Sequence, residues 1–303
     1  MIAHAARGEP LKSETAKAAP RFAHEIRSHR LAPLAHQMGG HGFGPDFLAA
    51  TLFYQRAAAI ARQAIEAISM VGVPVLLIKG ISLATRIYAD PGERPMSDID
   101  LLVPSSGHAD ASAALRRLGY WIAGPAAERG RFHHATTFKR RAAAIDLHRS
   151  IVQPLRRGST IAGLWDRARP ADSAFPYALI ADHIDETLLV MTHIARHELV
   201  VPAIGYVDGH RLLMALSDNQ RSHLIERAAR AQLRRGLEAV ITMTDILAND
   251  TVCPKRLRAI HRSVIELRPL RRGTQLRRKL SLLDSPVEAV RLAFGSFLEK
   301  SGW

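Results

Sequence analysis

The spacing of apolar residues predicts two kinds of element in the first third of the chain. From residue 46 to about residue 70, apolar side chains recur every three or four positions, which is typical of an amphipathic helix. Residues 73–78 and 99–103 are instead short, apolar and rich in valine and isoleucine, which predicts two buried strands. The chain therefore passes from a helix into a small sheet.

Further along, the pattern predicts a hairpin and then a long helical stretch. Residues 132–138 and 142–147 have strand character and are joined by a basic turn, so they are expected to pair. From about residue 182 nearly every segment has a helical period. The helices expected there cover residues 185–197, 209–216, 220–230, 233–247 and 286–298.

These elements together predict an α+β fold, in which a small mixed sheet lies between an N-terminal helical segment and a helical C-terminal domain. We expect residues 1–20, which are polar and rich in alanine and lysine, to be disordered or loosely helical. Residues 21–70 would form the helical lead-in, residues 71–150 the sheet-containing core and residues 151–303 the helical C-terminal domain.

The composition is that of an ordinary globular protein. Of 303 residues, 47% are hydrophobic and 23% charged, and no apolar run reaches the roughly 18–20 residues that a membrane span needs. The N-terminal stretch lacks the apolar centre of a secretory signal, so we expect a cytoplasmic protein with no membrane partner. The single cysteine, Cys253, excludes an internal disulfide and a CxxC zinc site.

The charge is strongly basic and unevenly distributed. The net charge is +14, and residues 221–300 contain 17 basic and 8 acidic side chains. Such a surface attracts polyanions, so an anionic partner at this region is one interpretation; a solvated, arginine-rich helical face is the other. Aromatic residues make up only 6% and do not alternate with the basic ones, so stacking platforms for single-stranded nucleic acid are not evident.

The first predicted strand runs directly into the sequence Lys79-Gly80-Ile81-Ser82. A glycine at this place allows backbone amides to approach a phosphate closely, and a following helix would add a favourable dipole. Ser82 could donate its hydroxyl to a phosphate oxygen, and Lys79 or Arg94 could supply positive charge nearby. Many strand–glycine–helix turns bind nothing, so the turn alone does not identify a site.

The second predicted strand opens with Asp98-Ile99-Asp100. Residues two apart on a strand share a face, so the two carboxylates are expected to lie side by side, where they repel each other unless a cation neutralises them. Oxygen ligands of this kind suit magnesium. The alternative is structural: Asp98 caps a turn and Asp100 pairs with Arg94.

The combination of this turn with an Asp-x-Asp strand sixteen residues after Ser82 resembles the nucleotidyltransferase superfamily related to DNA polymerase beta. The stretch is most similar to the branch called uncharacterised nucleotidyltransferases. The resemblance covers roughly residues 45–215 and is densest between residues 72 and 103. The matching positions are Gly72 to Leu77, Lys79, Gly80, Tyr88, Arg94, Asp98, Asp100 to Val103, Leu118 to Tyr120 and Ala144 to His148.

The resemblance implies a nucleotidyltransferase domain that binds two magnesium ions and a nucleoside triphosphate, expected to be ATP. Gly80 and Ser82 would hold its phosphates. Asp98, Asp100 and a third carboxylate, Asp146, would bind the metals. The enzyme would then transfer a nucleotidyl group to a hydroxyl of a small molecule, protein or peptide and release pyrophosphate.

Five further residues have two interpretations each. His148 shares a strand face with Asp146, and either orients substrate or forms a hydrogen-bonded Asp–His pair. Lys79 and Arg94 either contact phosphate or form salt bridges with carboxylates. His193 and His197 are four residues apart, but the sequence HIARH lacks the glutamate of a zinc-protease helix, so a packed or hydrogen-bonded pair is expected rather than a zinc site.

Two functions of other classes also fit the sequence. One is a non-catalytic, antitoxin-like partner that binds nucleotide without turnover, although the complete set of three carboxylates argues against it. The other is nucleic-acid binding or end modification through the basic C-terminal region, which would show a steep salt dependence.

Overall fold

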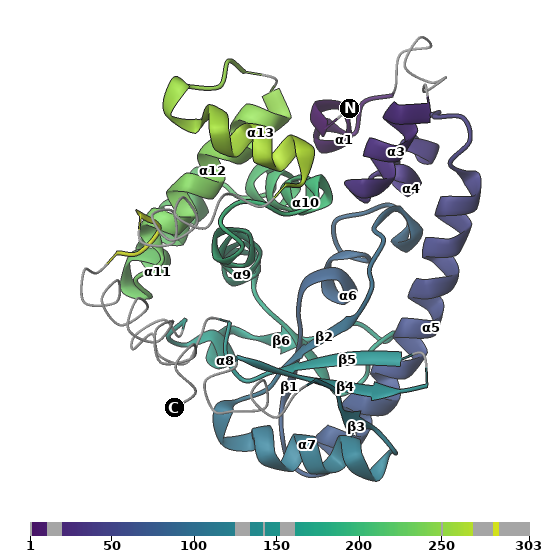
Figure 1. Ribbon diagram of the computed structural model, residues 1–303. Helices are drawn as coiled ribbons and strands as arrows, with labels where there is room; N and C mark the ends of the chain where they lie inside the picture. The colour runs from purple at the N-terminus through teal and green to yellow at the C-terminus, as the bar shows by residue number, and fades with distance from the viewer. Residues whose placement is uncertain are drawn as a thin grey trace, which may run out of the picture.

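The computed structural model describes residues 2–10, 20–124, 134–141, 143–151, 161–249, 251–268 and 281–284. In these residues seven strands form one mixed sheet, in the order β3-β4-β5-β2-β1-β7-β6 (Figure 1). The strands are β1 (Val75–Leu77), β2 (Ile99–Leu102), β3 (Trp121–Ile122), β4 (Ala135–Arg140), β5 (Ala143–His148), β6 (Arg169–Pro170) and β7 (Ala178–Ile180).

The predicted strands and hairpin are present, and the sheet contains more than they suggested. β4 and β5 pair antiparallel around Arg141, β2 pairs antiparallel with β1, and β2 pairs parallel with β5. The α+β class and the mixed sheet are therefore confirmed. Strands β6 and β7 come from beyond residue 150, and β7 pairs parallel with β1. The sheet therefore extends past the expected end of the core at residue 150.

One face of the sheet packs on two helices, α5 (Gly44–Ser69) and α7 (His108–Arg117). Leu77, Leu101 and Leu147 belong to this buried cluster. Alanines at the buried positions of α5 allow its backbone to approach the sheet closely. Because side chains alternate along a strand, the neighbours of these leucines point to the opposite face, towards the C-terminal helices.

The opposite face is covered by α9 (His183–Arg196). Leu76 and Leu102 share a core with Leu188 and Met191 of this helix. Asp182 caps α9, because its carboxylate accepts a hydrogen bond from the backbone N–H of Asp185 at 2.7 Å. Three further helices pack on α9: α10 (Ala203–Met214), α11 (Asp218–Arg230) and α12 (Arg234–Asn249). Helix α13 (Arg258–Glu266) follows them in the chain.

The N-terminal helices α1 (Ile2–Arg7), α3 (Pro20–Ser28) and α4 (Ala32–Gln37) share a hydrophobic core with α10 and α12 (Figure 1). The helix at residues 2–7 agrees with the helical alternative for the N-terminal segment; residues 11–19 lie outside the described residues. Pro33 stands in the first turn of α4, where its missing N–H costs nothing.

Five short helical turns complete the described structure. They are α6 (Lys79–Leu83), η1 (Pro91–Glu93), η2 (Ser105–Gly107), α8 (Leu164–Arg167) and η4 (Lys255–Leu257). The helix expected at residues 286–298 falls outside the described residues. Among the helices described, none combines the length and apolar character needed to cross a membrane.

Candidate active site

Asp100 and Asp146 are direct partners across the parallel pair β2 and β5. This register places the two carboxylates at the same level of the sheet, on the face that α9 covers. Their neighbours Ile99 and Ile145 are also partners, and both are buried in the core on the other side. On β4, Thr137 donates its hydroxyl to Oδ1 of Asp146 at 2.6 Å. Strand pairing therefore brings together two carboxylates that are far apart in the sequence.

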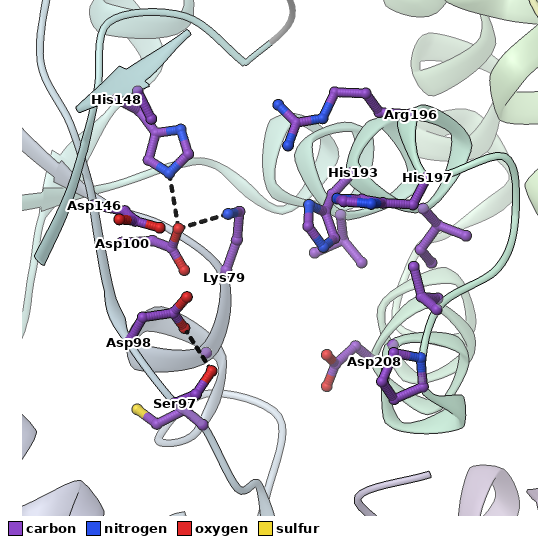
Figure 2. Close-up of a pocket in the computed structure, with 18 of the residues that line it drawn as sticks. Lys79, Ser97, Asp98, Asp100, Asp146, His148, His193, Arg196, His197 and Asp208 are labelled. Atoms are coloured by element: carbon purple, nitrogen blue, oxygen red, sulfur yellow. Dashed lines mark hydrogen bonds and ion pairs between the residues drawn. The ribbon is translucent and has the colours of Figure 1, made fainter. Parts of the chain in front are cut away.

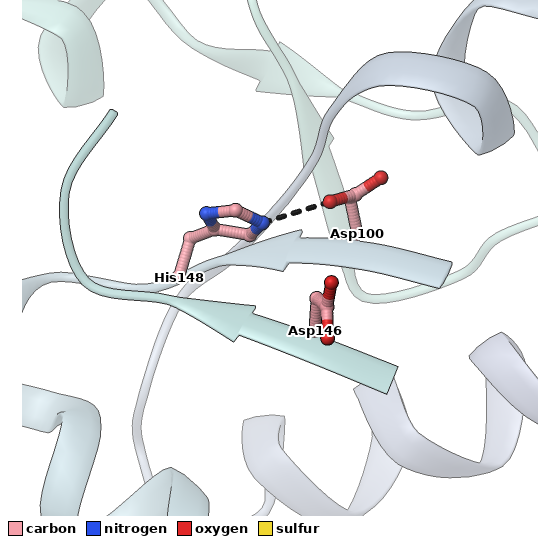
Figure 3. Close-up of side chains that lie close together, drawn as sticks. All are labelled: Asp100, Asp146 and His148. Carbon is pink, nitrogen blue, oxygen red and sulfur yellow. Dashed lines mark hydrogen bonds and ion pairs between the residues drawn. The ribbon is translucent and has the colours of Figure 1, made fainter. Parts of the chain in front are cut away.

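Asp100 is buried and has two basic partners (Figure 2). Nζ of Lys79 lies 2.5 Å from Oδ1 of Asp100. Nε2 of His148 lies 2.8 Å from the same oxygen (Figure 3). Burial would raise the pKa of Asp100, but the Lys79 charge and the His148 hydrogen bond outweigh it and hold the pKa well below its usual range. Asp100 is therefore a carboxylate at neutral pH, and Nε2 of His148 carries the proton that it donates.

Asp98 is the residue just before β2, and it lines the same pocket. Its setting is the reverse of that of Asp100: burial and the negative charges of Asp100 and Asp146 raise its pKa. Its hydrogen-bond donor is the hydroxyl of Ser97, at 3.3 Å from Oδ1 (Figure 2). The negative charges of Asp100 and Asp146 repel that of Asp98, and a cation bound among the three carboxylates would remove this repulsion.

The tightest group of possible metal ligands differs from the predicted Asp-x-Asp pair. One ligand atom from each of Asp100, Asp146 and His148 lies within 4.8 Å of the other two. Carboxylate oxygens suit magnesium, so the two aspartates fit a divalent cation, and Asp98 adds a third carboxylate from the edge of the pocket. Because Nε2 of His148 is already bonded to Asp100, this histidine fits the role of orienting a ligating carboxylate.

The turn after β1 differs from the expectation in one respect. The helix begins at Lys79, so Gly80 and Ser82 lie inside α6. Gly80 lines the pocket, and a Cβ there would stand 3.0 Å from Nη1 of Arg94 and 3.2 Å from Cβ of Met96, so a larger residue would require these side chains to shift. The hydroxyl of Ser82 is buried and donates to Oε1 of Glu186 at 2.6 Å. The structure therefore brings Gly80, and not Ser82, to the pocket.

Arg94 lines the pocket, but its guanidinium is bound to the carboxylate of Asp208 on α10. Nη2 of Arg94 lies 2.6 Å from Oδ2 of Asp208, and the hydroxyl of Tyr88 donates to Oδ1 at 2.6 Å. The salt-bridge interpretation therefore describes Arg94 as the structure has it, with Asp208 as partner. The salt-bridge interpretation also describes Lys79, whose partner is Asp100.

The pocket has a volume of about 660 Å³ and lies between the sheet and the helical part of the chain (Figure 2). The sheet side contributes three carboxylates, which form what we call the acidic wall: Asp98, Asp100 and Asp146. The opposite side, the helical wall, comes from α9, from α10 and from the segment that joins them. Its members are Val190, His193, Ile194, Arg196, His197, Val200, Val201, Pro202, Ile204, Gly205 and Asp208.

His193 and His197 pack as expected, with ring centroids 4.7 Å apart and the rings edge to face. Burial, and then the nearby charge of Lys79, hold the pKa of His193 well below its usual range, so it is neutral at pH 7. Arg196, in the last turn of the same helix, also lines the pocket and was not predicted from the sequence; its guanidinium points into the pocket (Figure 2). No sequence motif identifies Arg196. The one signal was the expected end of a helix next to an apolar segment, which is typical of a turn that packs against the rest of the fold.

The sheet and the pocket both lie within a stretch of the chain that matches a known protein family. A family described as "uncharacterised nucleotidyltransferase" matches residues 14–249, which include the sheet, the pocket and helices α9 to α12. A search of curated proteins finds no match. The match covers more than half of the chain and both walls of the pocket. The chain belongs to the uncharacterised nucleotidyltransferase family and is a nucleotidyltransferase.

Proposed function

We propose that the protein transfers a nucleoside monophosphate, AMP in the first instance, to a hydroxyl group of a small molecule, protein or peptide. The donor is the nucleoside triphosphate, and pyrophosphate leaves. The observation that carries the proposal is the register of β2 and β5, which places Asp100 opposite Asp146 in a pocket that also holds Asp98 and Gly80. Family membership supports a triphosphate substrate.

Asp98, Asp100 and Asp146 would hold two magnesium ions. When bound, such ions neutralise charge on the phosphates and polarise the bond that breaks. His148 and Thr137 orient Asp100 and Asp146 through the hydrogen bonds at 2.8 and 2.6 Å. Such support matters because rates fall steeply when a reacting group is displaced by about 1 Å.

The phosphate side of the site would be formed by Lys79 and the backbone at Gly80. The ammonium of Lys79 is paired with Asp100, and it can exchange that carboxylate for a phosphate oxygen when a cation binds Asp100. Arg94 keeps its place by binding Asp208 and so shapes the pocket beside Gly80. The phosphate contact that the sequence predicted from Ser82 is not part of the proposal, because the Ser82 hydroxyl donates its hydrogen bond to Glu186.

Asp146 lies on the acceptor side. Its Oδ1 accepts from Thr137, so Oδ2 remains to accept the proton of the attacking hydroxyl. The acceptor oxygen then forms a bond to the α-phosphorus, and the bond from that phosphorus to the pyrophosphate oxygen breaks. Protons and charge balance, because the proton passes to Asp146 and pyrophosphate takes the electron pair.

The test uses ATP labelled either at the α- or at the γ-phosphate, with magnesium and a panel of hydroxyl-bearing small molecules and peptides. We expect the α-label to appear on an acceptor and the γ-label in pyrophosphate. Asp98→Ala and Asp100→Ala should abolish both while the far-UV spectrum and the melting temperature show a folded protein. Transfer of the γ-label, or pyrophosphate release that survives both changes, contradicts the proposal.

The other candidates have less support. The three carboxylates and their supporting hydrogen bonds are intact, which a non-catalytic nucleotide binder would not need. The expected anionic partner of residues 221–300 stays a prediction, since residues 250, 269–280 and 285–300 of that region lie outside the described structure. The cytoplasmic location also stays a prediction.

A further inference from the structure

Four lysine and arginine side chains line the pocket, and they differ in their partners. Lys79 is paired with Asp100, Arg94 with Asp208, and Arg30 donates to the hydroxyl of Ser97 at 3.4 Å. Arg196 has no hydrogen-bond or ion-pair partner among the described residues. It stands in the last turn of α9, on the helical wall, with its guanidinium directed into the pocket (Figure 2).

This position is unfavourable for a guanidinium without a ligand. Arginine stays protonated in proteins, so it cannot escape burial by losing its charge. Burial lowers the pKa of Arg196, and the charge of Asp100 across the pocket opposes that effect only in part. A partly buried charge is normally paired, and here a bound anion would provide the pair.

A role in stabilising the helix does not explain where the side chain points. Basic residues in the last turn of a helix interact favourably with its dipole. Arg117 has the same place in the last turn of α7, and its side chain is exposed to solvent. The dipole is therefore satisfied without burial, and the position of Arg196 in the pocket requires another reason.

The neighbours of Arg196 indicate the chemistry of the anion. His193, one turn earlier on α9, is neutral and can donate an N–H without adding charge. Across the pocket stands the acidic wall, which repels a free anion but attracts one that carries a divalent cation. A phosphate group with bound magnesium satisfies both walls, because its cation meets the carboxylates and its free oxygens meet the guanidinium.

We propose that Arg196 and His193 form a phosphate-binding subsite on the helical wall. The inference rests on the proposed function for the identity of the ligand. The phosphate comes either from the polyphosphate chain of the nucleotide or from an anionic group of the acceptor, and these two sources separate in the experiment. Arg196 contributes the charge and His193 a neutral hydrogen bond, so substitution of Arg196 has the larger effect.

The experiment measures binding by calorimetry in magnesium, without turnover. The probes are pyrophosphate, AMP, a non-hydrolysable ATP analogue, and inorganic phosphate added to the protein saturated with that analogue. The variants are Arg196→Gln and Arg196→Lys. The matched control is Arg117→Gln, which removes the same charge from the same place in another helix, and melting temperatures check that each variant is folded.

If the nucleotide is the source, Arg196→Gln weakens binding of pyrophosphate and of the ATP analogue by about 10- to 100-fold and leaves AMP unchanged. If the acceptor is the source, only the binding of inorganic phosphate to the saturated protein weakens by that factor. Arg196→Lys should restore part of the loss, since lysine keeps the charge without the planar fork. Arg117→Gln should bind every probe like the unmodified protein.

The subsite is overturned if the unmodified protein and Arg196→Gln bind every probe with equal affinity. It is also overturned if the unmodified protein binds none of the anions. The labelled-ATP assay with the Asp100 variant tests the proposed function separately. A protein that binds pyrophosphate through Arg196 but releases none from ATP keeps the subsite and loses the transferase mechanism.

Discussion

The two walls of the pocket are built in different ways. The acidic wall lies on paired strands, and each of its carboxylates has partners from the same sheet or the turn beside it, such as Lys79, Thr137 and His148. The helical wall lies on α9 and α10 and includes Arg196, which lacks a partner among the described side chains. The difference suggests that one wall is organised before substrate binds, whereas the other is completed by it.

The walls are held together by buried ion pairs. Arg94, next to the acidic wall, binds Asp208 on α10, and Arg86, just after α6, binds Glu186 on α9. Such pairs add little stability compared with apolar packing, but removing one partner leaves a buried charge. The shape of the pocket therefore depends on a few long-range contacts, and the following changes test each wall and the link between them.

The largest effect is expected at the centre of the acidic wall. Asp100→Asn keeps the shape of the side chain but removes the charge that a metal and Lys79 require, so nucleotidyl transfer should fall by about 1000-fold or more. Initial rates of pyrophosphate release measure it. Asp110→Asn, an exposed aspartate on α7, is the control and should keep the rate. A fall of less than about tenfold for Asp100→Asn would mean that this carboxylate does not hold the metal.

The next effect concerns the link between the walls. Asp208→Ala leaves the guanidinium of Arg94 and the hydroxyl of Tyr88 without their partner, so the free energy of unfolding should fall by about 3–5 kcal/mol. Urea denaturation measures it. Glu226→Ala breaks the exposed pair with Arg230 and should cost less than about 1 kcal/mol. Similar losses for the two variants would show that the link is not buried.

A smaller effect is expected at Ser82, and it separates the two interpretations of that residue. Ser82→Ala removes a buried hydrogen bond to Glu186, so the free energy of unfolding should fall by about 1–2 kcal/mol. The KM for ATP should stay within about twofold. Ser222→Ala, on the exposed side of α11, is the control for stability. A large rise in KM with unchanged stability would instead support the phosphate contact that the sequence predicted.

The smallest effect on stability is expected at Asp98, and it depends on pH. Its pKa is raised, so the folded state loses stability as the pH rises from the ordinary carboxyl pKa through the raised value. Asp98→Asn removes that loss, and without divalent cations its melting temperature at pH 7 should exceed that of the unmodified protein by about 1–3 °C. Below about pH 3.9 the difference should vanish. A lower melting temperature at pH 7 would contradict the cause assigned to the shift.

The sequence predicted much of the acidic wall because its signals are local. Apolar runs indicated the strands at residues 75–77 and 99–102, and a basic turn indicated the hairpin that carries Asp146. Asp98 was expected on the strand and lies one residue before it, which is within the uncertainty of any strand end. For these elements, side-chain period and turn chemistry were sufficient.

The partners of the charged residues were not predictable in the same way. Ser82 binds a residue 104 positions away and Arg94 one that is 114 positions away. The sequence by itself indicated the central strands, most of the helices and the Asp98–Asp100 pair, because alternation and helical period act over a few residues; Asp146 was expected from the family resemblance, and strands β6 and β7 were not predicted. Only the tertiary structure decided that Asp100 faces Asp146, that Ser82 turns to Glu186 and that Arg196 enters the pocket. Such contacts depend on how α9 and α10 pack on the sheet, and no local pattern encodes that packing.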